Sequence, residues 1–151
     1  SVRGFSDFGG GCENNETRKQ AAIRECYEES NGFFGSSSNL EIKVQNCLSE
    51  ISSQSYTSYL VSYVYVHEIV QGFNSNYECI KKKHPEIIEN NCLFEKTEIK
   101  YFSEYELETE AHTIRKFYSN EFIPVIIQKK EMIREKIREK IRERMKEFIP
   151  N

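Results

Sequence analysis

The chain has 151 residues, 13% of them aromatic and 30% charged, with a net charge of −3, as is typical of one soluble globular domain. No apolar run approaches the ~20 residues needed to cross a bilayer, and the first residues lack a signal-peptide pattern, so no membrane location is expected. Five cysteines without a C-x-x-C pair argue against a disulfide framework or zinc knuckle and favour a reducing, cytoplasmic compartment.

The first predicted elements are the end of a strand at Phe5–Phe8, a glycine loop at Gly9–Gly11 and a helix beyond it. The loop lacks the third glycine of a dinucleotide fingerprint and the lysine of a P-loop, so alone it would be an ordinary loop. Asn14, Asn15 and Thr17 supply turn and capping chemistry for the start of the helix.

The predicted helix places three carboxylates on one face, because Glu25, Glu28 and Glu29 stand at i, i+3 and i+4. Three like charges repel one another unless cations compensate them. Magnesium is a hard cation that takes carboxylate oxygens and keeps waters and phosphates as further ligands. Glu16 and Arg24 form an opposite-charge pair that is expected to attach the helix to the loop. Taken alone, however, a glutamate cluster is more often a solvated helix face.

The joint spacing from Gly10 to Glu29 resembles the signature of the Nudix hydrolases. The matching positions are Gly10, Glu16, Arg24, Glu25, Glu28 and Glu29. One position departs from the family pattern. The family has a glycine two residues after the last glutamate of the motif, which is Glu29 here, and this chain has Asn31 at that position, followed by Gly32. Both residue types tolerate the left-handed conformation that ends a helix, so the turn is still expected to form.

The resemblance implies an enzyme that cleaves a diphosphate bond in a nucleoside diphosphate linked to another group, using Mg²⁺ or Mn²⁺. Such metals bridge diphosphate oxygens, neutralise charge on the leaving phosphate and acidify a bound water. The implied metal ligands are Glu25, Glu28, Glu29 and the carbonyl of Gly9. The implied supporting residues are Gly10, Glu16 and Arg24.

The middle of the chain is predicted to contain two strands and a surface insertion. Leu40–Leu48 alternates Leu, Ile and Val as a strand, and the aromatic and β-branched run Tyr56–Ile69 is expected to be central in a sheet. The polar, Asn-rich segment Val70–Cys92 is expected to lie on the surface. Its lysine run, Lys81–Lys83, is more often a solvated face than a phosphate-attracting one.

The segment Phe94–Leu107 is predicted to form a strand, a turn and a short helix. It resembles the late Nudix segment of the mRNA-decapping members. By that match Glu95 corresponds to an extra glutamate that reaches the metals or acts as the catalytic base, with Glu98 as the second choice. The ordinary alternative for either is a strand-edge carboxylate. The choice of base between Glu25 and Glu95 stays open.

The C-terminal segment is predicted to be a long, charged helix with a narrow apolar edge. The edge consists of Ile133, Ile137, Ile141 and Met145. Steps of four overshoot a 3.6-residue turn, so the edge drifts around the helix. From Lys129 to Glu147 the local charge is +4, which leaves −7 on the rest. Packing on its own domain or on a second chain is the favoured use, and nucleic-acid binding is the second.

The predicted fold is therefore an α/β (α+β) molecule, a Nudix-type α/β/α sandwich with a mixed sheet over residues 1–124, followed by the long helix at 125–151. In the resembled family two or three strands precede the signature, whereas only nine residues precede Gly10 here. The resemblance thus implies that N-terminal strands are missing or that a partner chain completes the sheet.

The predicted function is Mg²⁺- or Mn²⁺-dependent hydrolysis of a diphosphate bond, with capped mRNA as the leading substrate. Free nucleotides and diphosphoinositol polyphosphates are the next substrates. A Nudix-homology module that binds nucleotides or RNA, or that scaffolds an assembly without turnover, is the alternative from another class.

Overall fold

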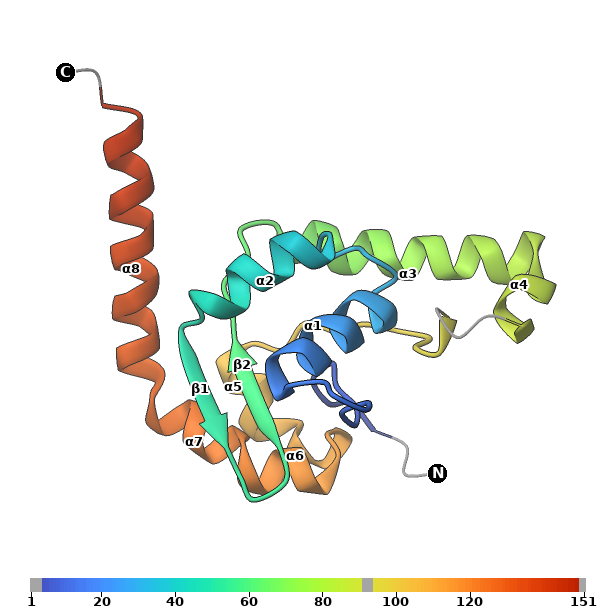
Figure 1. Ribbon diagram of the computed structural model, residues 1–151, viewed down its shortest axis with the longest axis horizontal. Coiled ribbons are helices and arrows are strands. Elements are labelled where there is room, and N and C mark those ends of the chain that lie inside the picture. The colour runs from blue at the N-terminus through green and yellow to red at the C-terminus, as the bar shows by residue number, and fades with distance from the viewer. Residues whose placement is uncertain (1–3, 91–93, 150–151) are drawn as a thin grey trace.

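The computed structural model describes residues 4–90 and 94–149, and it shows a mixed α and β molecule in which helices predominate (Figure 1). The elements begin with α1 (Arg18–Glu29), α2 (Ser37–Gln45), β1 (Ser49–Ser52), β2 (Thr57–Leu60), α3 (Val66–Lys83) and α4 (Pro85–Asn90). They continue with α5 (Glu104–Thr109), the 3-10 turn η2 (Ala111–Thr113), α6 (Lys116–Glu121), α7 (Ile123–Gln128) and α8 (Lys130–Glu147). No helix in the described part of the chain is long and apolar enough to span a bilayer.

Helix α1 begins and ends as its sequence predicts. Thr17 caps it by accepting a hydrogen bond from the Gln20 amide, while the Gln20 side chain accepts one from the Thr17 amide. This reciprocal capping satisfies amide groups that have no partner inside the helix. After the helix, Asn31 and Gly32 adopt positive φ angles of 51° and 74°. The expected left-handed turn therefore forms with Asn31 in the position of the family's glycine.

The prediction of a strand at Leu40–Leu48 is wrong, because α2 occupies most of this segment. Ser36 caps the helix at the Asn39 amide, and Leu40 and Val44 are buried one helical turn apart. Ile42, which the alternation would have placed on the same side as Leu40, is 59% exposed. The apolar residues fit both the period of a strand and that of a helix. The serine cap and the packing against α1 favour the helix.

The prediction of a long central strand at Tyr56–Ile69 is also wrong beyond its first part. Only Thr57–Leu60 forms a strand, and it pairs antiparallel with β1 in a sheet that has two strands within the described residues. Val66 already belongs to α3. A strand of four residues with one neighbour is an edge strand, so the aromatic run did not mark the middle of a sheet.

Helix α3 replaces most of the expected surface insertion at Val70–Cys92, whose last two residues, Asn91 and Cys92, lie outside the described part of the chain. Its residues Phe73 and Tyr77 are buried, Phe73 with only 1% of its surface exposed. The ring of Phe73 packs edge-on against Phe33 at 5.9 Å between centroids. The segment thus contributes to the core, although its lysine run Lys81–Lys83 is solvent-exposed as expected.

The predicted strand after Phe94 is not found, because residues 95–103 belong to no helix or strand. The backbone of this segment is instead held at Ile99, which exchanges two hydrogen bonds of 2.9 Å with the Asn74 side chain of α3. The predicted short helix is confirmed as α5, capped by Ser103. Close by, Phe5 forms an isolated parallel bridge with Ile114, so the expected strand end at Phe5 has a single bridging partner.

The predicted long C-terminal helix is found as α8, which projects from the rest of the molecule (Figure 1). Its predicted start at residue 125 is wrong, because α7 ends at Gln128 and Lys129 separates the two helices. Two lysines of α8 attach it to the body: Lys136 Nζ donates to the Leu48 carbonyl at 2.8 Å and Lys140 Nζ to the Asn46 carbonyl at 2.6 Å. Ile133 is half-buried, whereas Ile141 is 53% exposed. The apolar edge is therefore covered by the body only along the first half of the helix.

Candidate active site on helix α1

The carboxylate of Glu29 lies at the junction of α1, the glycine loop and the segment that follows Phe94. Its Oε2 accepts a hydrogen bond from the Gly9 amide at 2.9 Å, and its Oε1 lies 2.8 Å from Lys96 Nζ. The residue is only 4% exposed. Burial raises the pKa of Glu29 above its usual range, and the contacts with Lys96 and Gly9 partly offset this rise. Glu29 is thus an acid placed in the interior beside one cation and one amide.

Arg24 connects the other carboxylates of α1 to the loop. Its Nε lies 2.9 Å from Glu16 Oε1, which confirms the predicted ion pair. Its Nη1 donates to Glu25 at 2.9 Å and to Glu28 at 3.3 Å, and its Nη2 donates to the Gly11 carbonyl at 3.0 Å. The hydrogen bonds to these carboxylates raise the pKa of Arg24, and the guanidinium lowers the pKa of Glu16. A planar donor group with several N–H groups suits this role better than a lysine would.

Two glycines of the loop lie directly against the ends of other side chains, which an added Cβ would displace. A Cβ on Gly10 would lie 2.3 Å from Glu25 Oε1, and a Cβ on Gly9 would lie 2.1 Å from the Tyr56 hydroxyl. Both distances are far below van der Waals contact. Gly10 therefore allows the carboxylate of Glu25 to lie directly against the loop.

The segment after Phe94 contacts α1 through Lys96. The side chain of Glu95 is 67% exposed, and its Oε1 lies 4.0 Å from Lys96 Nζ. Glu98 is exposed at the edge of a cavity described below. Sequence reasoning singled out the two glutamates and did not consider Lys96. The available signal was a lysine directly after Glu95, which by itself does not indicate a contact with α1.

In the described part of the chain, no group of three or more His, Cys, Asp or Glu side chains is arranged so that it could hold a metal ion. Arg24 and Lys96 pair with the three glutamates and offset part of their negative charge. The donor set itself fits Mg²⁺ or Mn²⁺, because all three side chains supply hard oxygen ligands from one helix face. A metal would have to displace Arg24 Nη1 and Lys96 Nζ from the carboxylate oxygens.

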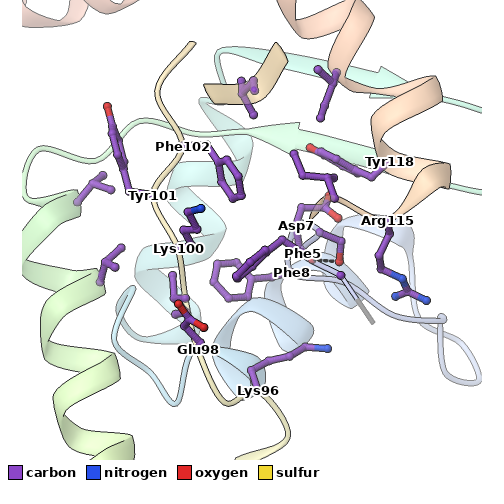
Figure 2. A pocket seen from close by; sticks show the side chains of 18 of the residues that line it. Phe5, Asp7, Phe8, Lys96, Glu98, Lys100, Tyr101, Phe102, Arg115 and Tyr118 are labelled. Atoms are coloured by element: carbon purple, nitrogen blue, oxygen red, sulfur yellow. Dashed lines mark hydrogen bonds between the residues drawn. The ribbon is translucent and has the colours of Figure 1, made fainter. Parts of the chain in front are cut away.

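Beside this site lies a cavity of about 470 Å³ with aromatic walls (Figure 2). Its aromatic lining residues are Phe5, Phe8, Phe34, Tyr101, Phe102 and Tyr118. Lys96 also lines it, so the cavity borders the carboxylate helix. Such a volume lies within the range of ~300–1,000 Å³ found for small-molecule sites.

One half-buried carboxylate, that of Asp7, forms part of the cavity wall. Its Oδ1 accepts a hydrogen bond from the Tyr56 hydroxyl at 2.9 Å and its Oδ2 accepts one from Ser58 Oγ at 3.1 Å. Burial raises the pKa of Asp7 to about 6, an effect larger than the lowering by these two hydroxyls. Sequence reasoning did not identify Asp7, because a single acidic residue near the end of a predicted strand has no distinctive spacing.

Comparison of the chain with models of protein families, with curated proteins and with solved structures finds no match. The function is therefore argued from the geometry of the site and from the resemblance of its motif.

Proposed function

We propose that the protein is a Mg²⁺- or Mn²⁺-dependent diphosphate hydrolase of the Nudix type. The observation that carries this proposal is the arrangement around Arg24, which joins Glu16 and the glycine loop to Glu25 and Glu28. The same loop donates its Gly9 amide to Glu29. A helix whose acidic face is fixed against a glycine loop by an arginine is what the motif requires of a site that binds a metal–diphosphate complex.

The residues of the site would have different roles. Glu25, Glu28 and Glu29, with the Gly9 carbonyl, would hold the metal, which when bound polarises the phosphoryl group and acidifies a water. Arg24 would hold the helix against the glycine loop through its bonds to Glu16 and to the Gly11 carbonyl. Glu25 or Glu95 would take a proton from the attacking water. Glu25 is favoured, because its carboxylate lies against Gly10 while the side chain of Glu95 is largely in solvent.

The leading substrate remains capped mRNA, and free nucleotides and diphosphoinositol polyphosphates are the alternatives. All three carry the diphosphate bond that the metal site would attack. The aromatic cavity beside Lys96 supports a substrate with a planar base over an inositol phosphate, which has no aromatic ring. Product analysis after incubating the protein and Mn²⁺ with each substrate separates the three.

The α/β/α sandwich belongs to the same proposal. Its mixed sheet would need further strands beside β1 or β2, supplied by other chain segments or by a partner chain. The short antiparallel pair β1–β2 has an open side on each strand within the described residues, which is compatible with such an addition.

The decisive experiment substitutes the acidic face of α1. Glu28→Gln and Glu29→Gln each remove one negative charge from the proposed ligand set and are expected to lower turnover by orders of magnitude while the protein stays folded. Circular dichroism checks the fold, and release of phosphate-containing product measures turnover. Glu41→Gln, which changes an exposed glutamate on α2, is the matched control. Wild-type turnover in excess EDTA, or unchanged kinetics in both α1 variants, would defeat the proposal.

A second candidate function is binding of nucleotide or RNA without turnover. The observation that favours it is that Arg24 and Lys96 already pair with the three glutamates, so each of these carboxylates has a cationic partner without a metal. Saturable nucleotide binding together with no turnover in Mg²⁺ or Mn²⁺ would select this module over the hydrolase.

A further inference from the structure

The exposed end of α8, residues 141–149, carries an apolar face. Ile141, Met145, Phe148 and Ile149 stand at i, i+4, i+7 and i+8, so they lie on one side of the helix, within about 100° of one another. Each of the four side chains is more than half exposed. Figure 1 shows this end of the helix pointing away from the body. The described part of the chain therefore leaves the face without a cover.

Cations lie along both sides of this apolar face, and acids lie behind it. Arg142 and Lys146 are about 60° and 100° from Met145 in one direction around the helix, and Arg144 is about 100° from it in the other. Lys140 lies farther round, and its Nζ donates to a backbone carbonyl of the body. The acids of the same turns are about 120–160° from Met145, and they are Glu139, Glu143 and Glu147.

The positive charge beside the apolar face is largely uncompensated. Within the described residues Arg144 and Lys146 make no ion pair, and Arg142 makes one, with Glu135 at 3.3 Å. On α2, burial and the charges of two cations of α8, one of them Arg144, lower the pKa of Lys43. Like charges gathered without acidic partners attract an anionic surface.

The combination of the two kinds of surface identifies the partner. A helix with an apolar face and flanking cations is suited to the interface of a bilayer, where its apolar side chains enter the acyl region and its Lys and Arg contact acidic headgroups. A second copy of α8 fits less well, because pairing two such faces in either direction would place cationic flanks against each other. Nucleic acid would contact the cations but leave the apolar side chains in water.

We propose that residues 141–149 of α8 form a docking surface for a membrane that contains anionic lipids. Such a helix lies on the bilayer and does not cross it, so it needs no apolar run of ~20 residues. A short apolar face with few cations gives weak, reversible binding that depends on acidic headgroups and on low salt. The proposal is independent of the proposed hydrolysis, because none of these residues belongs to the site on α1.

Flotation of the full chain with lipid vesicles tests the proposal. One set of vesicles is phosphatidylcholine alone, and the other is phosphatidylcholine mixed with phosphatidylserine. Binding to the mixed vesicles is expected to be at least about tenfold tighter, because each cation near an anionic surface adds to the attraction. It is also expected to weaken as salt is added. No binding, or equal binding to both sets, would overturn the proposal.

A double variant tests the apolar face. Met145→Gln with Phe148→Gln is expected to weaken binding to the mixed vesicles at least about tenfold, since two apolar side chains no longer enter the bilayer. The matched control is Met132→Gln with Tyr105→Gln, which changes a methionine and an aromatic residue exposed elsewhere, on the first turn of α8 and on α5. Unchanged binding in the first variant, or an equal loss in the control, would overturn the proposal.

A triple variant tests the cations. Arg142→Gln, Arg144→Gln and Lys146→Gln together are expected to remove the preference for phosphatidylserine. The control changes the three exposed lysines Lys81–Lys83 of α3 to Gln, which alters the net charge by the same amount. An equal loss in both triple variants would mean that only the overall charge attracts the vesicles, and would overturn the proposal.

A fluorescent reporter shows whether this end of α8 enters the lipid, and it decides if a multiple variant does not fold. The chain contains no tryptophan, so Phe148→Trp introduces a single one. Its emission is expected to shift to shorter wavelength on the mixed vesicles, whereas that of Tyr105→Trp should not. Absence of the shift in Phe148→Trp would overturn the proposal. Light scattering that shows a dimer dissociated by Met145→Gln with Phe148→Gln would also overturn it, because a second copy would then cover the face.

Discussion

Lys96 is the residue whose contact most changes the chemistry expected of α1. It pairs with Glu29, an acid with almost no exposed surface. Its Nζ contacts Glu29 Oε1, an oxygen that a bound metal would also need. Removing one partner of such a pair leaves a buried charge without compensation. The lysine and a metal ion are therefore competitors for Glu29.

Lys96→Met is expected to tighten Mn²⁺ binding about tenfold, because a charge-assisted hydrogen bond worth ~1.5–3 kcal/mol no longer has to be broken. Without metal the variant is expected to be less stable by roughly 1–3 kcal/mol, since Glu29 loses its cation. Calorimetric titration with Mn²⁺ and urea unfolding in EDTA measure the two effects.

Lys100→Met is the control for this variant, because Lys100 pairs with Glu110 and not with α1. Its Mn²⁺ affinity should equal that of the unmodified protein. Weaker Mn²⁺ binding in Lys96→Met would mean that the lysine assists the metal and would contradict the competition.

Asp7 gives a prediction about stability and pH. Its pKa is about 6 in the folded protein against 3.8 for an ordinary aspartate, and Tyr56, Ser58 and Tyr118 surround it. Between these values the folded state holds a proton that the unfolded state releases, so the contribution of Asp7 to stability falls as pH rises from about 4 to about 6. Asp7→Asn should therefore be more stable than the unmodified protein by roughly 1–3 kcal/mol at pH 7, and about equal to it at pH 4.

Urea unfolding at pH 4, 5 and 7 measures this difference, with Glu41→Gln as a variant of an exposed carboxylate. A stability difference for Asp7→Asn that is the same at all three values would rule out the charge of Asp7 as its cause.

At the scale of single residues, the sequence could predict contacts between groups joined by one helix and its loop. The Glu16–Arg24 pair, the Thr17 cap and the Asn31–Gly32 turn depend on local spacing alone, and each was predicted. The contacts of Lys96 and Asp7 depend instead on which segments, distant in the sequence, pack together. The contact between Lys96 and Glu29 joins residues that lie 67 positions apart in the sequence (96 − 29), and no periodicity encodes it.

At the scale of elements, the side chain of Asn74 links α3 to the segment that follows Phe94. This side chain makes two hydrogen bonds to Ile99 that would otherwise come from a neighbouring strand. Asn74→Ala is expected to cost roughly 1–3 kcal/mol, because it leaves the Ile99 amide and carbonyl without these partners. Amide exchange should also become faster across 95–102, the segment that carries Lys96 to α1.

Hydrogen exchange with mass spectrometry measures this loosening, and Gln71→Ala on an exposed position of the same helix is the control. Unchanged exchange in Asn74→Ala would show that other contacts hold the segment.

The errors in the predicted elements have one physical origin. Leu40, Ile42 and Val44 alternate as in a strand, yet Leu40 and Val44 also stand one helical turn apart, and the helix buries this second pair. In α3 the positions Phe73 and Tyr77 have the same spacing, hidden within a polar segment. When the apolar residues of a short segment fit both the helical and the strand period, tertiary packing decides which element forms, and a single sequence does not show that packing.

At the scale of the molecule, the sequence correctly predicted a mixed α and β chain with a long final helix, but not the small size of the sheet. The expected sheet rested on four segments: Leu40–Leu48 became α2, Tyr56–Ile69 forms a strand only at Thr57–Leu60, and neither Phe5–Phe8 nor the segment after Phe94 forms a strand of the sheet. The final helix was predictable because its pattern is long, highly charged and free of glycine and proline.

The exposed end of α8 gives the prediction about assembly. It presents Ile141, Met145, Phe148 and Ile149 to solvent. If these residues join two copies of the chain, deleting residues 141–151 should convert an oligomer into a monomer while preserving the fold, because Lys136 and Lys140 still attach the remaining part. Multi-angle light scattering measures the mass. A monomer before and after the deletion would exclude self-assembly, and a loss of RNA affinity alone would assign this end to nucleic acid.

The attachment of α8 also has a mechanical consequence. Its 18 residues form a rod of about 27 Å, and it meets α7 at the single residue Lys129. Long lysine side chains, which rotate easily, fix much of its direction. A rotation of about 10° at Lys129 would carry the free tip through about 5 Å, given that length. Because of this length, a small rotation near β1 would produce a large displacement of the tip.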